Sequence, residues 1–152
     1  MLFRSADAGA NNIIIYNGFV SPIGIWSQVT YNAGNFSNSG GTSWTVDNAD
    51  QLVFEWSRAG KTLSVNLVLV NTSVTGAVTG LLVKIPNGYL ANKRAVIPFT
   101  YKNGASYGTG AADIDPAGGG YISLLLDVGG SVNWTAGANS TNVYLDCSFE
   151  VQ

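Results

Sequence analysis

The stretch Lys61-Thr-Leu-Ser-Val-Asn-Leu-Val-Leu-Val-Asn71 decides the fold class of this chain of 152 residues. Leu63, Val65, Leu67 and Leu69 occupy alternate positions, with short polar side chains between the first of them. Successive side chains of a β-strand point to opposite faces of a sheet, so this alternation predicts a strand with one buried face and one solvent face. Residues 142–152 repeat the pattern and predict a second strand of the same kind.

Six further segments combine alternation or a short apolar run with flanking turn signals. They are residues 12–16, 25–31, 51–57, 80–85, 95–101 and 121–128. Asn-Gly and Gly-Gly pairs between the segments favour the positive φ angles of tight hairpin turns. Pro98 has no N–H group, so we expect it at a sheet edge or a bulge. The whole pattern predicts an all-β fold, an antiparallel β-sandwich of the jelly-roll type.

The length corresponds to about one domain, and we expect a single β-sandwich domain over residues 13–152. Residues 1–12 carry no core-facing pattern. They are interpreted either as a frayed terminus or as an N-terminal arm that orders against a neighbouring subunit. Asp7 lies where a signal peptide has its apolar run, and Gly and Pro residues interrupt the apolar stretch 13–26. The sequence therefore predicts neither a signal peptide nor a membrane span.

Charged residues make up only 11% of the chain, against about 25% in typical domains. The polar surface must then consist of Asn, Ser, Thr and Gly, which are cheaper to desolvate against a partner than charged groups. We therefore expect the chain to associate with copies of itself, and a monomeric β domain with an unusual surface is the alternative. The net charge is −2 and no basic cluster exceeds Lys93-Arg94, which argues against binding to nucleic acid or to a membrane surface.

The chain contains no histidine, so the commonest general base and most zinc sites are excluded. Its one cysteine, Cys147, lies on the apolar face of a predicted strand and is expected to be a buried hydrophobe. Gly108–Gly110 and Gly118–Gly120 lack the following helix and the lysine of a phosphate-binding loop, and are interpreted as loops. We expect no enzymatic activity and no cofactor.

Asp113 and Asp115 are the best-placed carboxylates, because residues two apart on a strand share a face. They precede Pro116 and a glycine run, so we interpret them as a solvated, turn-forming pair. A calcium site, or the acid/base pair of a glycosidase, is the alternative.

Aromatic side chains are the remaining candidates for a binding surface. Trp56 shares a predicted face with Leu52 and Phe54, which favours a core position. Trp44 and Trp134 lie among Ser, Thr, Asn and Gly, a setting typical of sugar-binding or protein-binding surfaces. Tyr89 and Tyr107 lie in or near predicted loops. The candidate ligand or partner surface is Trp44, Trp134, Tyr89 and Tyr107, although for each of them core packing or ordinary surface exposure is the favoured interpretation.

Residues 44–101 resemble a pattern found in virion proteins of tailed bacteriophages. The pattern runs Trp44-Thr45, then Phe54-Glu-Trp-Ser-Arg-Ala-Gly-Lys61 and Leu63-Ser-Val-Asn-Leu67, then Val83-Lys-Ile-Pro-Asn-Gly88 and Ile97-Pro-Phe99. The glycine-rich segment 117–128 and the final strand 141–152 are similar to modules of the same proteins. The resemblance is to the β-sandwich knobs of tail fibres, tail tips and capsid decoration proteins, and covers about two thirds of the chain.

The resemblance implies a homotrimer located in the virion and assembled in the host cytoplasm. Only about a dozen residues precede the first predicted strand, which suits a capsid decoration (cement) protein that binds the major capsid protein at the outer capsid surface. A tail-fibre or tail-tip knob that contacts tail proteins and binds a host receptor or surface glycan is the alternative. A carbohydrate-binding module outside viruses and a glycosidase are further alternatives.

Overall fold

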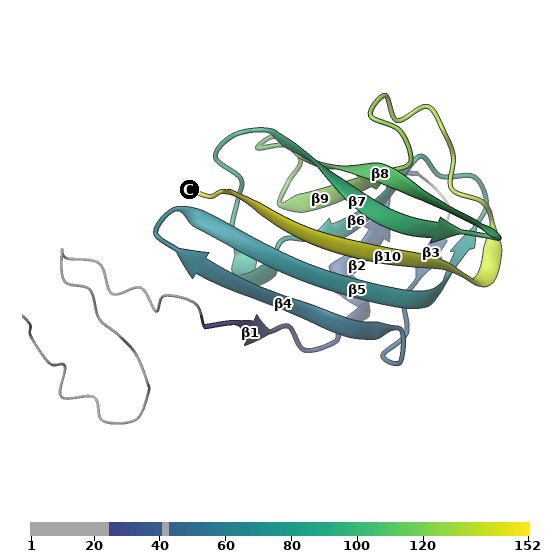
Figure 1. Cartoon of the computed structure of the whole chain (residues 1–152), viewed down its shortest axis with the longest axis horizontal. Helices are drawn as coiled ribbons and strands as arrows, with labels where there is room; N and C mark the ends of the chain where they lie inside the picture. Colours follow the sequence, from purple (N-terminus) through teal and green to yellow (C-terminus); the bar gives the residue numbers. More distant parts are fainter. Residues whose placement is uncertain (1–24, 41–42) are drawn as a thin grey trace, which may run out of the picture.

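The computed structural model describes residues 25–40 and 43–152, which form strands and two short 3-10 helices (Figure 1). The strands are β1 (Ser27–Gln28), β2 (Phe36–Asn38), β3 (Ser43–Thr45), β4 (Gln51–Ala59), β5 (Thr62–Thr75), β6 (Gly80–Lys84), β7 (Ala95–Asn103), β8 (Ser106–Ile114), β9 (Tyr121–Leu125) and β10 (Gly137–Glu150). The 3-10 helices are η1 (Ala33–Asn35) and η2 (Pro86–Gly88). The predicted arm, residues 1–12, and the predicted strand 12–16 lie outside the described residues.

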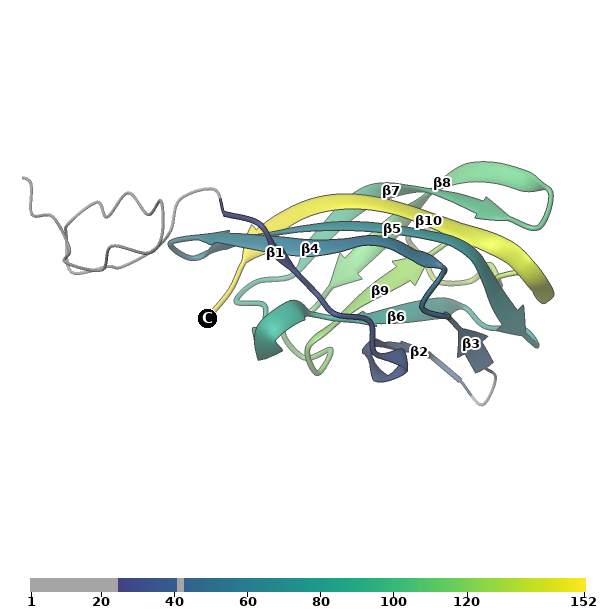
Figure 2. The same ribbon diagram turned by 90° about the horizontal axis from the view of Figure 1, so that it is seen from below.

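Every strand pair in the structure is antiparallel, which confirms the predicted all-β antiparallel class. The strands follow one hydrogen-bonded path, β1-β4-β5-β10-β7-β8-β9-β6-β2, and β3 pairs with the end of β5. The path curls over, so that β4, β5, β10 and β7 lie in one layer and β9, β6 and β2 lie in the facing layer (Figure 2). The fold is thus one curled sheet rather than two separate sheets.

The hydrophobic core fills the space between the two layers. The alternate residues Leu63, Val65, Leu67 and Leu69 of β5 are all fully buried. On the neighbouring strand β10, the alternate residues from Val143 to Phe149 are buried as well, and they pair with these four residues of β5. The long strands predicted from their alternation therefore form the centre of the larger layer, as expected for half-buried strands.

Pro98 lies on an edge, as predicted. β7 pairs with β10 only through residues 100–103, while its whole length pairs with β8. Among the described residues, the part of β7 before Thr100 therefore borders no strand on the β10 side, and a proline there removes no ladder hydrogen bond to a described strand on that side.

Two local predictions were wrong. Gly108–Gly110 lies inside β8 rather than in a loop, because Tyr101 and Phe99 pair across the ladder with Gly108 and Gly110 and their rings occupy the space above the glycines. Leu52 does not share the buried face of Phe54. A register shift between Gln51 and Val53 turns Leu52 outward, and 61% of its side chain is exposed.

Candidate interaction surfaces

Trp44 and Trp134 lie in the core, which agrees with the favoured interpretation and rules them out as members of a candidate binding surface. Their exposed fractions are 6% and 1%. Each indole N–H donates a hydrogen bond inside the protein, from Trp44 to Thr72 Oγ1 at 2.9 Å and from Trp134 to the Leu124 carbonyl at 3.1 Å. The Ser, Thr, Asn and Gly residues next to each tryptophan in the sequence lie in loops or at outward positions. Their polarity therefore does not indicate the direction of the indole side chain.

Tyr89 and Tyr107 lie at opposite ends of the molecule. Tyr89 is partly buried beside Trp56, with ring centroids 5.5 Å apart, and the Arg58 guanidinium covers its ring at 4.8 Å. Hydrogen bonds from Arg58 and Asn87 lower the pKa of Tyr89 below its usual value. Tyr107 is 70% exposed at the start of β8. The structure does not bring the four predicted aromatic residues together, and only Tyr107 presents a largely open ring.

The predicted position of Cys147 is confirmed, since its side chain is 3% exposed. Burial raises the pKa of its thiol to about 12, so the thiolate needed for nucleophilic chemistry is absent at neutral pH. Asp113 forms a two-pronged ion pair with Arg94, at 2.9 and 2.8 Å. Asp115 accepts the amide of Ala117 at 2.8 Å, which confirms its turn-forming role. Within residues 25–40 and 43–152, no three acidic or cysteine side chains gather as metal ligands.

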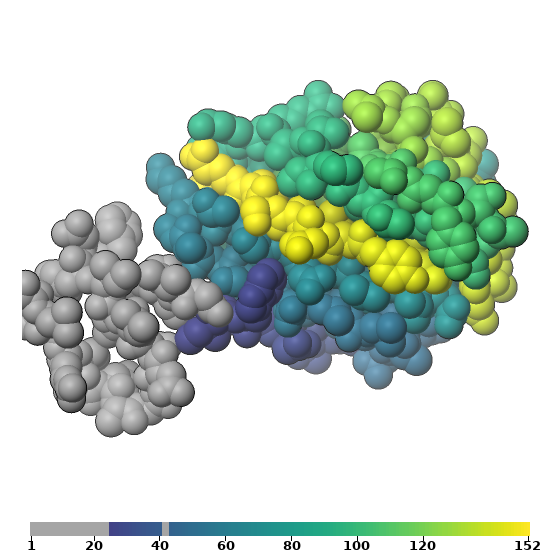
Figure 3. All heavy atoms as spheres, viewed as in Figure 1, coloured from purple at the N-terminus to yellow at the C-terminus, as the bar shows by residue number. Residues whose placement is uncertain are grey.

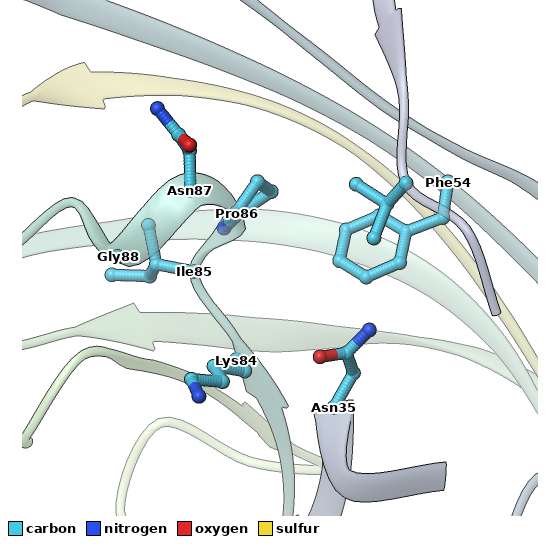
Figure 4. A pocket seen from close by; sticks show the side chains of 8 residues that line it. Asn35, Phe54, Lys84, Ile85, Pro86, Asn87 and Gly88 are labelled. Atoms are coloured by element: carbon cyan, nitrogen blue, oxygen red, sulfur yellow. The ribbon is translucent and has the colours of Figure 1, made fainter. Parts of the chain in front are cut away.

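A hollow of about 170 Å³ opens between β4, η1 and η2 (Figure 4). Its lining residues are Val29, Asn35, Phe54, Lys84, Ile85, Pro86, Asn87 and Gly88. Asn87 points away from it in the close-up view. Small-molecule pockets usually enclose roughly 300–1,000 Å³, so this hollow is smaller than a typical ligand site.

The outer face of the larger layer carries an apolar patch that alternation alone would not place there. We define the outer patch as Leu52, Val53, Val68, Val70 and Tyr144. Val53 pairs with Val68, and Val68 pairs with Tyr144, so these three form a continuous row across β4, β5 and β10. The amides of Leu52 and Val70 both donate to the Asp50 carbonyl, which places these residues side by side. Figure 3 looks onto this face.

The outer patch has mixed exposure. Leu52 is 61% exposed and Tyr144 is 37% exposed, while the three valines are partly buried by their neighbours. On one side of the row, Glu55 and Asp146 lie two residues farther along β4 and β10. On the other side, Lys102 of β7 pairs with Asn142 of β10. The patch is thus an apolar surface with acids at one border and a lysine at the other.

The sequence held a signal for the outer patch. Residues 67–70 are four consecutive apolar residues, so Val68 and Val70 break the alternation that the rest of β5 follows. On a strand with one solvent face, such a run indicates that the solvent face has become apolar. The alternation predicted for residues 61–71 therefore holds only as far as Leu67.

A comparison of the chain with protein-family models, curated proteins and solved structures found no match. Within the described part of the chain, no helix is long and apolar enough to cross a membrane.

Proposed function

We propose that this chain is a structural subunit of a tailed-bacteriophage particle, a capsid decoration protein that binds the outer capsid surface as a homo-oligomer. The observation that carries the oligomer is the outer patch, which places apolar side chains on the solvent side of the larger layer. The resemblance of residues 44–101 to phage knobs supports the virion location and the trimer.

The outer patch suits association between copies for two physical reasons. Burying apolar surface contributes roughly 25 cal/mol per Å², and a patch without charged members carries no charge to desolvate. Its borders also differ in sign, with Glu55 and Asp146 on one side and Lys102 on the other. A second copy can therefore set opposite charges against each other around the apolar contact.

The function would be passive. A protein that binds only the assembled shell stabilises that shell by mass action, with no chemical step. This agrees with a fold in which Trp44, Trp134 and Cys147 are buried in the core.

The oligomer is tested by analytical ultracentrifugation of the wild type and Val68→Lys. We expect the wild type to sediment as an oligomer and Val68→Lys to sediment as a monomer with an unchanged circular dichroism spectrum. Thr62→Lys is the matched control, because Thr62 lies on the same face of β5, exposed and outside the patch. A monomeric wild type, or an oligomer that Val68→Lys leaves intact, contradicts the proposal.

The decoration role is tested by counting copies of the chain against the major capsid protein in purified particles, by quantitative mass spectrometry. We expect a stoichiometry comparable to that of the capsid protein. A handful of copies per particle would instead place the chain in the tail.

A tail-tip knob that binds a host glycan is the second candidate, favoured by the exposed ring of Tyr107. Aromatic rings at protein surfaces commonly combine an apolar face with a polar group that hydrogen-bonds a ligand. Glycan-array binding that Tyr107→Ala abolishes would support this candidate, and an array without signal would count against it.

A further inference from the structure

Four outward side chains of β7 and β8 form a polar and aromatic group beside the outer patch. We define the β7–β8 cluster as Thr100, Lys102, Tyr107 and Thr109. Across the ladder, Thr100 pairs with Thr109 and Lys102 pairs with Tyr107. Paired residues of antiparallel strands point to the same face, with Cβ atoms about 4.5–5.5 Å apart. Thr100 also pairs with Tyr144 of the outer patch, which places the whole cluster on the outer face.

The polar groups of the β7–β8 cluster are not bonded to other parts of the described chain. Within that part of the chain, no hydrogen bond or ion pair engages the Lys102 ammonium, the Tyr107 hydroxyl or the two threonine hydroxyls. Elsewhere on the same face, polar side chains bond to one another, since Gln28 and Asn66 both donate to Glu55. The cluster therefore keeps an ammonium group and three hydroxyl groups available to a ligand.

Lys102 gives the cluster a positive charge with no acid next to it. Its paired residue on β10 is Asn142, and the nearest acid along that strand is Asp146. Asp146 lies four residues beyond Asn142, roughly 13 Å along the strand at about 3.3 Å per residue. Asp47 and Asp50 precede β4, which β5 and β10 separate from β7. An exposed ammonium without an acidic partner favours an anionic ligand.

Tyr107 adds an open aromatic ring to this charge. Its side chain is 70% exposed, at the start of β8. An aromatic ring offers an apolar face to the C–H groups of a sugar ring, and threonine hydroxyls both donate to and accept from sugar hydroxyls. The ring, the hydroxyls and the ammonium together match a sugar that carries a carboxylate.

We propose that the β7–β8 cluster binds an acidic saccharide. Tyr107 stacks on a sugar ring and Lys102 donates to the sugar carboxylate, while the two threonines hydrogen-bond the sugar hydroxyls. The inference deepens the second candidate function and rests on that glycan-binding candidate, not on the decoration role. A single-stranded nucleic acid fits less well, because its binding depends on several phosphate contacts and the cluster holds one basic residue.

The cluster and the outer patch are neighbours that can act separately. Tyr107 lies on β8, and β7 separates β8 from β10, the nearest strand of the outer patch. Lys102 borders both surfaces, so the oligomeric state of each variant has to be measured beside its glycan binding.

The test is binding of the purified full chain to a glycan array that carries sialylated and uronic-acid glycans beside neutral glycans. We expect binding to the glycans with a carboxylate, weakened by added salt because the ionic contact is exposed. Lys102→Gln should bind about tenfold more weakly, the loss expected for one charged hydrogen bond. Tyr107→Ala should not bind, and Tyr107→Phe, which keeps the ring, should retain most of the binding.

Lys84→Gln is the matched control. Lys84 is an exposed lysine of β6, in the facing layer, and also forms no ion pair within the described part of the chain. It should bind like the wild type. Melting temperature and sedimentation of every variant separate a lost glycan contact from unfolding or a changed oligomer.

The outcomes separate this inference from both functions proposed above. If no glycan binds, the inference and the second candidate fail together, and the decoration role is unaffected. If only neutral glycans bind, glycan binding stands and the acidic class is wrong. If acidic glycans bind and Lys102→Gln binds equally well, the assigned site is wrong. Binding of a single-stranded oligonucleotide without binding of any glycan would overturn the saccharide in favour of a nucleic acid.

Discussion

At the scale of single residues, Trp134 joins the sheet to the long loop before β10. Its ring stacks on Phe99 with centroids 6.3 Å apart and meets Tyr101 edge-on at 5.3 Å. The indole N–H also satisfies the Leu124 carbonyl. One side chain therefore supplies apolar burial, ring contacts and a buried hydrogen bond at the same place.

Replacing Trp134 by Ala should lower the free energy of unfolding by about 3–5 kcal/mol, because a large cavity opens beneath β7. Urea unfolding followed by circular dichroism measures the change. Tyr107→Ala, at an exposed position, should change stability by about 0.5 kcal/mol or less. An equal effect of the two substitutions would contradict the placement of the two rings.

Cys147 should resist thiol reagents while the protein is folded. Burial raises the pKa of its thiol from 9.0 to about 12, so the reactive thiolate is scarce at mildly alkaline pH. Labelling with a chromogenic disulfide should be slow in buffer and complete in urea. Because the pKa is raised in the folded state, the contribution to stability is present below 9.0 and is lost as the pH rises toward about 12. Rapid labelling of folded protein would show that Cys147 is accessible.

Asp127 should titrate below its ordinary value. Hydrogen bonds from the Val132 amide and from Ser131 lower the pKa of this carboxyl below 3.8. Its contribution to loop stability is therefore present above 3.8 and is lost as the pH falls through the lowered pKa. The amide chemical shifts of Ser131 and Val132, followed by NMR during acidification, should have a midpoint below 3.8. Asp127→Asn should abolish that transition, and a midpoint at or above 3.8 would contradict the loop geometry.

At the scale of elements, β8 depends on glycines that face aromatic rings. A Cβ atom at residue 110 would lie 2.4 Å from the Leu125 carbonyl oxygen and 2.7 Å from the Phe99 ring. Glycine there lets β7, β8 and β9 approach closely, and the neighbouring ring covers the space that a side chain would fill. Glycine is thus a packing residue in this strand rather than a sign of a loop.

Gly110→Ala should destabilise the fold by about 1–3 kcal/mol, because backbone and ring must both shift to admit the methyl group. Thermal unfolding by calorimetry measures the loss. Gly40→Ala is the control, since a Cβ atom at that position meets nothing within 4 Å. Similar stability of the two variants would show that the close approach at Gly110 is not required.

Strands with regular alternation could be predicted from the sequence, and strands shaped by their neighbours could not. β5 and the second half of β10 follow the period of two because each borders the core on one face. β8 could not be predicted from its own sequence, because its glycines pair with Phe99 and Tyr101 of β7 and the rings of these residues cover them. The same limit applies to the candidate interaction surface, since the polar residues around Trp44 and Trp134 made both candidates although both indoles are buried.

At the scale of the whole molecule, β10 links the two halves of the sheet path. It pairs with β5 along nearly its entire length and with β7 at residues 141–144. Its buried side chains also complete the core face opposite β6 and β9. The fold therefore depends on this strand more than on the short strands β1, β2 and β3.

Deleting residues 145–152 should abolish cooperative folding, because β5 loses its central neighbour and the core is opened. Circular dichroism and the exclusion volume of the purified fragment measure the outcome. Deleting Gln152 alone, an exposed residue, should leave a cooperative unfolding transition. A compact fragment that still melts cooperatively would contradict the central role of β10.

The position of β10 also bears on how the protein is made. Some 60 residues separate Thr75, the end of β5, from Gly137, the start of its partner β10. At about 5–20 residues per second, a ribosome needs roughly 3–12 s to synthesise them. Throughout that interval the β4–β5 hairpin exposes an apolar face and an unpaired edge, each able to capture another nascent chain. The yield of folded protein in a cell should therefore depend on chaperones that hold this hairpin until the last strand emerges.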